Sequence, residues 1–192
     1  MAQLLLLNGP PGIGKSTLAR RWADERPGTL CLDVDVLHGF VGGSAGRFAE
    51  NGEVVRPLAL SMVTAHVRGG RDVVLPQYLG RTGEIARFEQ AARAGGASFA
   101  HVVLMDDEDA SVRRFDARGD EGWHAEVRSI VADHGGETFL RAMHRQLRVV
   151  MTERPEAVEV PSVDGDPDAT YAALLAALDG TRHETTYETE ER

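Results

Sequence analysis

Short apolar runs alternate with longer segments of mixed polarity along most of the chain. Each apolar run has the length of a buried strand, and the segment after it repeats its apolar residues at helical spacing. Repetition of a strand and a helix is typical of a parallel sheet covered on both faces. The predicted strands are 3–7, 29–33, 71–76, 98–105 and 157–160.

The predicted helices lie between these strands and after the last one. The first, Lys15–Arg26, should turn Leu18, Ala19 and Trp22 toward the core, because these residues share one helical face. Glycine pairs such as Gly69-Gly70 end helices in this pattern. The expected helices are 15–26, 53–68, 82–94, one from about 108, 126–133, 136–153 and 167–179.

The turn after the first strand matches the phosphate-binding motif G-x-x-x-x-G-K-[ST] in full. Its glycines let main-chain amides point inward at the positive end of a helix, where phosphate binds. Lys15 would neutralise the β- and γ-phosphates, Ser16 would hold Mg²⁺, and Thr17 would reach the α-phosphate. The sequence therefore predicts binding of ATP with Mg²⁺ rather than a merely glycine-rich turn. The nucleotide-binding residues are Gly9, Pro10, Pro11, Gly12, Ile13, Gly14, Lys15, Ser16 and Thr17.

Composition narrows the possible partners. The 192 residues carry a net charge of −9, which argues against a polyanionic partner such as nucleic acid. Lys15 is the only lysine, so an Asn-Lys-x-Asp base-reading motif of a GTPase is impossible. The single cysteine, Cys31, cannot form an intrachain disulfide and is expected to pack as a small core residue. No apolar run approaches the ~20 residues that span a bilayer, so no membrane span is expected. We also expect a cytoplasmic protein that is a monomer or a homodimer.

The second predicted strand ends in two acids, Asp33 and Asp35. If this segment is extended, a spacing of two puts both carboxylates on one side. The carboxyl ends of neighbouring parallel strands face the same crevice, so both acids should lie near the phosphate loop. Asp33 could then support Mg²⁺ while Asp35 takes the proton of an acceptor hydroxyl. The alternative is a helix cap or a solvated turn, where aspartate is also common.

These motifs resemble those of small P-loop kinases of the nucleoside, shikimate and gluconate kinase type. The chain looks most similar to chloramphenicol phosphotransferase and the tunicamycin-resistance ATP-binding proteins, and the kinase domain of phage polynucleotide kinase shares the layout. The resemblance covers residues 1 to about 178. It implies a three-layer α/β P-loop fold with a five-stranded parallel sheet in the order 2-3-1-4-5 and a small lid.

The resemblance also assigns roles to individual residues. The general-base aspartate of those kinases maps onto Asp35, and the apolar third strand running into a proline turn places Gln77 and Tyr78 beside the acceptor. Arginines after the fourth strand map onto Arg114 and Arg118, one helical turn apart, where they would clamp the transferring phosphate. Arg113 is a weaker candidate for the same role.

The sequence allows two interpretations of the lid arginines and two of Trp123 and His124. The lid would span roughly 114–126, yet its arginines could equally lie on an exposed helix face paired with Asp109 and Asp116. Trp123 and His124 could contact a ligand or pack at the solvent edge. By position alone, the loop 161–166 would hold adenine.

One departure from the kinase pattern concerns the metal. No acid ends the third strand, whereas the fourth ends in Asp106. If strand order placed that strand beside the phosphate-loop strand, Asp106 could support Mg²⁺ in place of Asp33. We favour Asp33, because the lid arginines follow Asp106 directly, as they do after the fourth strand of the kinases.

The acceptor pocket is expected around the glycine-rich stretch 38–51. Phe40 and Arg47 are the candidate substrate-binding residues there, with Phe48 and Asn51 close by in sequence. A flexible connection is an equally good interpretation of so many glycines. The stretch 1–179 is predicted to form one domain, and 180–192, rich in threonine and glutamate, to be a disordered acidic tail.

Three functions fit this sequence. The first is a kinase that transfers the γ-phosphoryl group of ATP to a hydroxyl of a small molecule, such as an antibiotic, sugar or nucleoside, with a role in antibiotic resistance or biosynthesis. The second is a polynucleotide 5′-hydroxyl kinase, which the net charge disfavours. The third is a P-loop protein that hydrolyses ATP as a switch or sequesters a ligand. A large ring-forming ATPase is disfavoured by the short chain.

Overall fold

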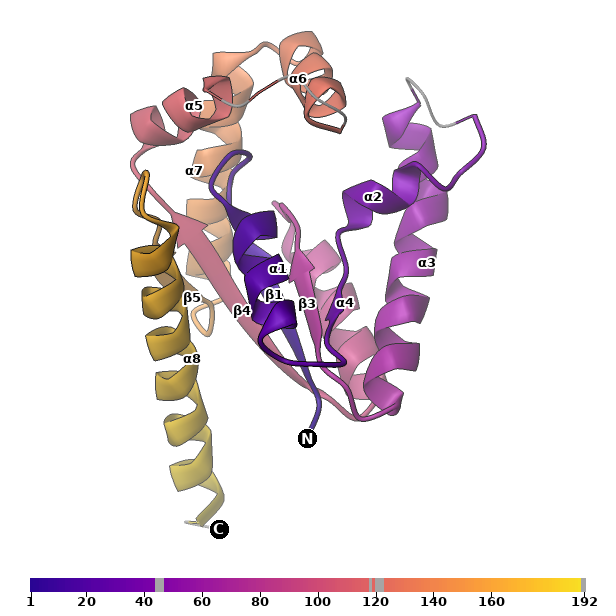
Figure 1. The fold of residues 1–192 in the computed structure, drawn as a ribbon, viewed down its shortest axis with the longest axis vertical. Helices are drawn as coiled ribbons and strands as arrows, with labels where there is room; N and C mark the ends of the chain where they lie inside the picture. The colour runs from indigo at the N-terminus through magenta and orange to yellow at the C-terminus, as the bar shows by residue number, and fades with distance from the viewer. Residues whose placement is uncertain (44–46, 118, 120–122, 191–192) are drawn as a thin grey trace.

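The protein is described here from a computed structural model that covers residues 1–43, 47–117, 119 and 123–190. Its described strands form one parallel sheet in the order β2-β3-β1-β4-β5, with helices on both faces (Figure 1). The predicted fold class and strand order are therefore confirmed. The elements are β1 Gln3–Asn8, α1 Lys15–Asp24, β2 Leu30–Cys31, α2 Val34–His38, α3 Phe48–Arg68, β3 Val73–Pro76, α4 Thr82–Ala94, β4 Ser98–Met105, α5 Glu108–Asp116, α6 Trp123–Asp133, α7 Glu137–Glu153, β5 Val158–Pro161 and α8 Pro167–Glu190.

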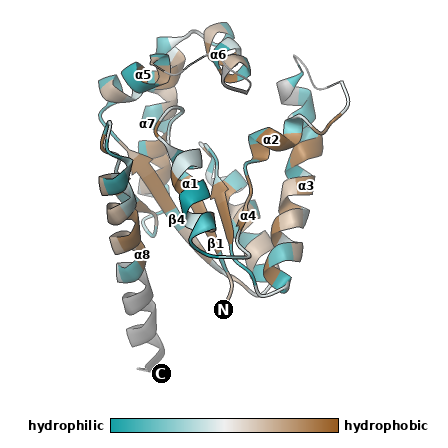
Figure 2. Ribbon diagram, viewed as in Figure 1, coloured by the Kyte–Doolittle hydropathy of each residue, from teal (hydrophilic) through white to brown (hydrophobic). Residues whose placement is uncertain are grey.

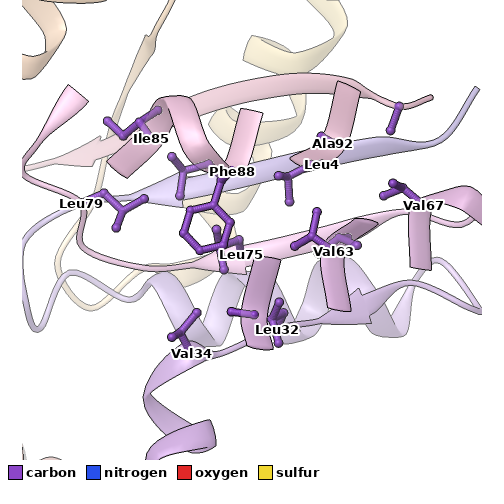
Figure 3. Packing of buried hydrophobic residues seen from close by; sticks show 14 of the residues in the cluster. Leu4, Leu32, Val34, Val63, Val67, Leu75, Leu79, Ile85, Phe88 and Ala92 are labelled. Atoms are coloured by element: carbon purple, nitrogen blue, oxygen red, sulfur yellow. The ribbon is translucent and has the colours of Figure 1, made fainter. Parts of the chain in front are cut away.

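The four leucines of β1 divide the hydrophobic core into two halves. Leu4 and Leu6 contribute to the cluster under α3 and α4, which Figure 3 shows from close by. Leu5 and Leu7 contribute to the cluster on the opposite face, with α1 and α8. Successive residues of a strand point to opposite faces, so a central strand covered on both sides needs an unbroken apolar run.

Register brings the ends of three strands to the same edge of the sheet. Leu7 lies opposite Pro76 of β3 and Val102 of β4, so β1 is paired on both sides up to the phosphate loop. Cys31, the last residue of β2, lies opposite Val74 of β3, so the loops that follow β1, β2 and β3 leave the sheet at the same edge. In Figure 1 this edge lies beneath α5 and α6.

The segment after β2 departs from the sequence-based expectation. Extended structure was predicted to Asp33, but the strand ends at Cys31 and a short helix, α2, begins at Val34. Val34 and Leu37 of α2 pack against the α3 side of the core. A helix buries both of these apolar side chains, and this burial favours helical over extended structure. The alternation of acids and valines did not indicate a helix.

The C-terminal segment is one long helix, and the disorder expected over 180–192 stays a prediction. Helix α8 continues from Pro167 to Glu190, through the stretch that composition predicts to be disordered. Leu174 and Leu178 anchor its first half in the core. In the described part of the chain, no helix is both long and apolar enough to span a bilayer.

A small separate core holds the helices above the sheet edge. It contains Val112 and Phe115 of α5, Val131 of α6 and Leu140 of α7. Helices α5 and α6 are thus held by α7, which itself packs against the sheet through Leu147 and Val150. This is the region where the sequence predicts a lid.

Candidate active site

The phosphate loop leaves β1 through two glycines that no other residue could replace without strain. Gly9 has a φ of 153°, and a Cβ there would come within 2.7 Å of the Leu104 carbonyl oxygen. Gly12 has a φ of 90°, and its Cβ would meet the Phe115 main-chain nitrogen at 3.0 Å. The loop is therefore held against β4 and α5, with positive φ angles that favour glycine.

Lys15 is positioned by the loop that it serves. Its Nζ donates hydrogen bonds to the carbonyl oxygens of Gly9 and Pro10, both at 2.9 Å. The side chain thus folds back over the loop at the start of α1. The first turn of α1 carries no acidic residue, so the positive end of the helix stays available to phosphate.

Asp33 links the phosphate loop to α2. Its Oδ1 accepts from the Asp35 main-chain amide at 3.1 Å as the N-cap of α2, and its Oδ2 accepts from Ser16 Oγ at 3.2 Å. Burial and the neighbouring Asp35 charge raise the pKa of the Asp33 carboxyl, although the hydrogen bonds and Lys15 act in the opposite direction. Asp33 therefore caps a helix, as the alternative interpretation of the sequence held, and also lies beside Ser16 of the phosphate loop.

Asp35 lies in the first turn of α2, not on an extended segment. The argument from a spacing of two along a strand was therefore wrong. The carboxylate nevertheless lies at the sheet edge, because Gln77, just after β3, donates from Nε2 to Asp35 Oδ1 at 3.1 Å. The helix turn and the end of β3 bring together two residues that the sequence placed at the acceptor.

Tyr78 is placed differently from Gln77. Its hydroxyl donates to the Met143 carbonyl oxygen of α7 at 3.3 Å, and its ring packs against the cluster containing Met105 and Leu147. Burial raises its pKa to about 12, so the phenol stays protonated at neutral pH. The structure thus brings Gln77, but not Tyr78, into contact with Asp35.

Arg114 joins three segments behind the phosphate loop. It donates to the Ile13 carbonyl oxygen at 3.2 Å, to Ser162 Oγ at 3.0 Å and to Asp106 Oδ2 at 3.2 Å. It also lies 3.5 Å from Asp164. The side chain is largely buried, so the alternative of an exposed face paired with Asp109 and Asp116 does not hold for Arg114.

The pairing of Arg114 also bears on the metal. Strand β4 does lie beside β1, so the condition under which Asp106 could replace Asp33 is met. However, Asp106 Oδ2 accepts from Arg114, whereas Asp33 contacts Ser16. A hydroxyl and a carboxylate oxygen suit Mg²⁺, which usually binds through one or two carboxylates plus phosphate oxygens. Asp33 and Ser16 fit that requirement.

The other substrate candidates lie on the surface near α2 and α3. The Phe40 side chain is 79% exposed, and Arg47 forms an exposed ion pair with Glu50 at 3.1 Å. Neither is shown in contact with Asp35 or Gln77 in the described residues. Arg118 lies outside the described residues, as do the side chains of Trp123 and His124.

Two residues that organise the site were not expected from the sequence. Asn8 is fully buried, and its Oδ1 accepts from the amides of Gly9 and Leu79 at 2.8 and 3.0 Å. Ser162 donates to the Ile13 carbonyl oxygen at 3.0 Å and so ties the loop after β5 to the phosphate loop. The only signal for Asn8 in the sequence was a polar residue directly after the four leucines of β1.

Comparison with known proteins identifies the family to which the chain belongs. A model of the AAA domain family matches residues 4–156. The chain belongs to this family. Among curated proteins, none matches in this comparison.

Two solved structures show what this AAA domain resembles in fold. A gluconokinase from Sinorhizobium meliloti 1021 superposes with a TM-score of 0.63 at 16% identity, covering 97% of each chain. A tunicamycin resistance protein from Deinococcus radiodurans gives 0.60 at 17% identity, covering 93% of this chain and 95% of that one. The AAA domain therefore has the fold of small P-loop kinases along nearly its whole length.

Proposed function

We propose that this AAA domain is an ATP- and Mg²⁺-dependent phosphotransferase that moves the γ-phosphoryl group to a hydroxyl of a small molecule. One observation carries the proposal. Asp33 contacts Ser16 of the phosphate loop while Asp35, two residues on, contacts Gln77 at the end of β3. A metal-side acid and a candidate base are thus held next to each other at the edge where phosphate would bind.

Each residue has a distinct task in the proposed reaction. Main-chain amides of the loop and Lys15 bind the phosphates, and Ser16 with Asp33 would hold Mg²⁺, which supplies positive charge to the phosphate oxygens. Arg114, and Arg118 by its position in the sequence, would stabilise charge on the transferring group. The contacts of Arg114 with Ile13 and Ser162 suggest that it also fixes the shape of the loop.

Asp35 is proposed as the general base. The acceptor oxygen forms a bond to the γ-phosphorus, the bond from that phosphorus to the bridging oxygen breaks, and the hydroxyl proton passes to the Asp35 carboxylate. ADP then leaves with the bridging oxygen. Gln77 holds one carboxylate oxygen at 3.1 Å, and a carboxylate can accept further donors such as an acceptor hydroxyl.

The acceptor is proposed as an antibiotic, sugar or nucleoside-like alcohol. The two solved structures described above are titled a gluconokinase and a tunicamycin resistance protein, and these titles support a small-molecule substrate. Phe40, Arg47 and Gln77 remain the proposed acceptor contacts. The competing functions are a polynucleotide 5′-hydroxyl kinase and an ATPase without an acceptor.

Replacement of Asp35 by asparagine distinguishes a kinase from an ATPase switch. Asp35→Asn keeps a similar shape but cannot take a proton, so phosphoryl transfer should fall by about 10²–10⁴-fold while ATP affinity changes little. Transfer is measured by mass spectrometry of hydroxyl compounds incubated with Mg·ATP, where a product gains one phosphate. ATP affinity is measured by titration calorimetry.

Two further variants complete this experiment. Asp24→Asn changes an exposed acid at the far end of α1 and should leave transfer unchanged. Lys15→Ala should weaken ATP binding under every hypothesis that uses the loop. If Asp35→Asn retains full transfer activity, the assigned base is wrong. Phosphate gain on a 5′-hydroxyl oligonucleotide, and on no small molecule, would favour the polynucleotide kinase.

A further inference from the structure

Helix α3 has an apolar face that points away from the protein. Its inner face is buried in the main core through Val55, Ala59, Val63 and Val67. A second set of apolar residues follows the same helix at a spacing of four. In this second set, Val54 and Leu58 are each 50% exposed and Met62 is 36% exposed.

This outer face is continuous over three turns. Pro57, Ser61 and Ala65 are exposed next to Val54 and Leu58, and at helical spacing they lie on the same side. From Val54 to Ala65 the face extends about 18 Å. Helix α3 forms the edge of the molecule in Figure 1, and its ribbon in Figure 2 carries hydrophobic as well as hydrophilic colours. Packing within one chain explains the inner face of α3 but not the outer one.

The two halves of the outer face have complementary shapes. The first half carries the larger side chains, Val54 and Leu58. The second half carries the small residues Ser61 and Ala65 beside the larger Met62. Ser61 and Ala65 line a surface hollow of about 340 Å³ together with Leu60, Thr64 and Arg68. A large side chain from another helix could enter this hollow.

Charges at the two ends of α3 are complementary as well. Glu50 and Glu53 are exposed in its first two turns, and Arg68 is exposed in its last turn. Between them, the outward side of the helix carries apolar residues and Ser61, whose hydroxyl donates to the Pro57 carbonyl oxygen of the same helix. A partner that fits would place a base at the start of α3 and an acid at its end.

We propose that this face binds a second copy of the same chain, with the two α3 helices antiparallel about a twofold axis. Such a rotation places Val54 and Leu58 of each copy against Ser61 and Ala65 of the other. It also brings Arg68 of each copy toward Glu50 of the other. A twofold interface must be self-complementary, and the large-to-small and acid-to-base gradients along α3 meet that condition.

The dimer should be weak and reversible. One pair of crossing helices buries less than the roughly 1,200 Å² of surface typical of stable complexes. Association should therefore depend on concentration across the micromolar range. Sedimentation velocity of the full chain should show conversion from the 20.8 kDa monomer to a species of twice that mass as concentration rises.

A single charged residue in the apolar face should weaken association strongly. Leu58→Glu places two carboxylates close to the twofold axis, so the dissociation constant should rise at least about tenfold. The matched control is Val149→Glu on α7, where a valine is 46% exposed far along the chain from α3. Circular dichroism and thermal unfolding check that both variants are folded.

A charge exchange tests the antiparallel arrangement itself. Glu50→Arg and Arg68→Glu should each weaken the dimer, and the double variant should restore it, because each changed residue then faces an opposite charge. A wild-type chain that stays monomeric up to near-millimolar concentration would overturn the proposal. So would a dimer unaffected by Leu58→Glu, or a double variant no better than the worse single one.

Discussion

At the scale of single residues, Asp33 combines a structural and a chemical task. Its carboxylate caps α2 and accepts from Ser16, yet burial and the charge of Asp35 raise its pKa. An acid with a raised pKa is held in an environment that disfavours its charge. A bound cation would relieve that cost. Under the proposed function, this cost would be the consequence of a site suited to Mg²⁺.

Asp33→Asn should separate these two tasks. Asparagine caps helices about as well as aspartate, so removal of the charge should leave the free energy of unfolding at pH 7 equal or slightly higher, while Mg²⁺-dependent ATP binding weakens. Thermal unfolding without nucleotide and titration with Mg·ATP measure the two effects.

The pH dependence of this variant has a defined sign. Because the folded pKa of Asp33 is raised, its charge destabilises the fold above that pKa, and the penalty is lost as pH falls through it. Any advantage of Asp33→Asn should therefore shrink in acid. A clear loss of stability at pH 7, comparable to that of Asp33→Ala, would contradict this interpretation.

At the scale of elements, Asn8 connects the end of β1 to the segment after β3. Its Nδ2 donates to the Leu79 carbonyl oxygen at 2.9 Å, in addition to the two main-chain amides that its Oδ1 accepts from. A buried main-chain group that loses its partner costs on the order of 1–3 kcal/mol. Asn8 thus fixes the phosphate loop relative to the loop that carries Gln77.

Asn8→Ala should therefore affect both stability and binding. We expect a loss of about 2–4 kcal/mol in the free energy of unfolding, together with weaker ATP binding, because the amides of Gly9 and Leu79 lose their acceptor. Denaturant unfolding and calorimetry measure the two quantities. The control is Gln3→Ala on the same strand, where the main-chain amide, not the side chain, bonds to Asp72. Equal effects of both substitutions would argue against the assigned role of Asn8.

At the scale of the whole molecule, the stability of the fold in acid depends on a buried histidine that contacts Asn8, the residue before the phosphate loop. His101 lies in β4 and is 3% exposed. Its Nε2 is 3.3 Å from Asn8 Nδ2, which can donate to it only while that ring nitrogen is unprotonated. Burial, with a smaller contribution from Arg154, lowers the pKa of His101 to about 4.

The fold should consequently lose stability in mild acid. The folded pKa lies below the usual 6.5, so the unfolded chain binds the proton first, and the free energy of unfolding falls as pH drops from 6.5 toward 4. The loss across this window should be on the order of 2–3 kcal/mol. His101→Gln should flatten this slope, as measured by denaturant unfolding at several pH values. An unchanged slope would show that other groups dominate.

How much of this molecule was predictable depends on the range of the interactions involved. The apolar run of β1 and the motif from Gly9 to Ser16 are local signals, and the strand order followed from resemblance to P-loop kinases. The boundaries of α4 and β4 were also expected as found. Helix α2 was missed, because burial of Val34 and Leu37 against α3 outweighed a pattern that looked extended.

The sequence by itself determined the layered sheet and a loop built to bind phosphate, because both follow from residues adjacent along the chain. Only the tertiary structure decided which acid meets Ser16, that Gln77 rather than Tyr78 contacts Asp35, and that Arg114 lies against the phosphate loop. Those contacts join residues up to 101 positions apart, from Ile13 to Arg114. Side-chain direction at such separation is set by packing, which no local pattern encodes.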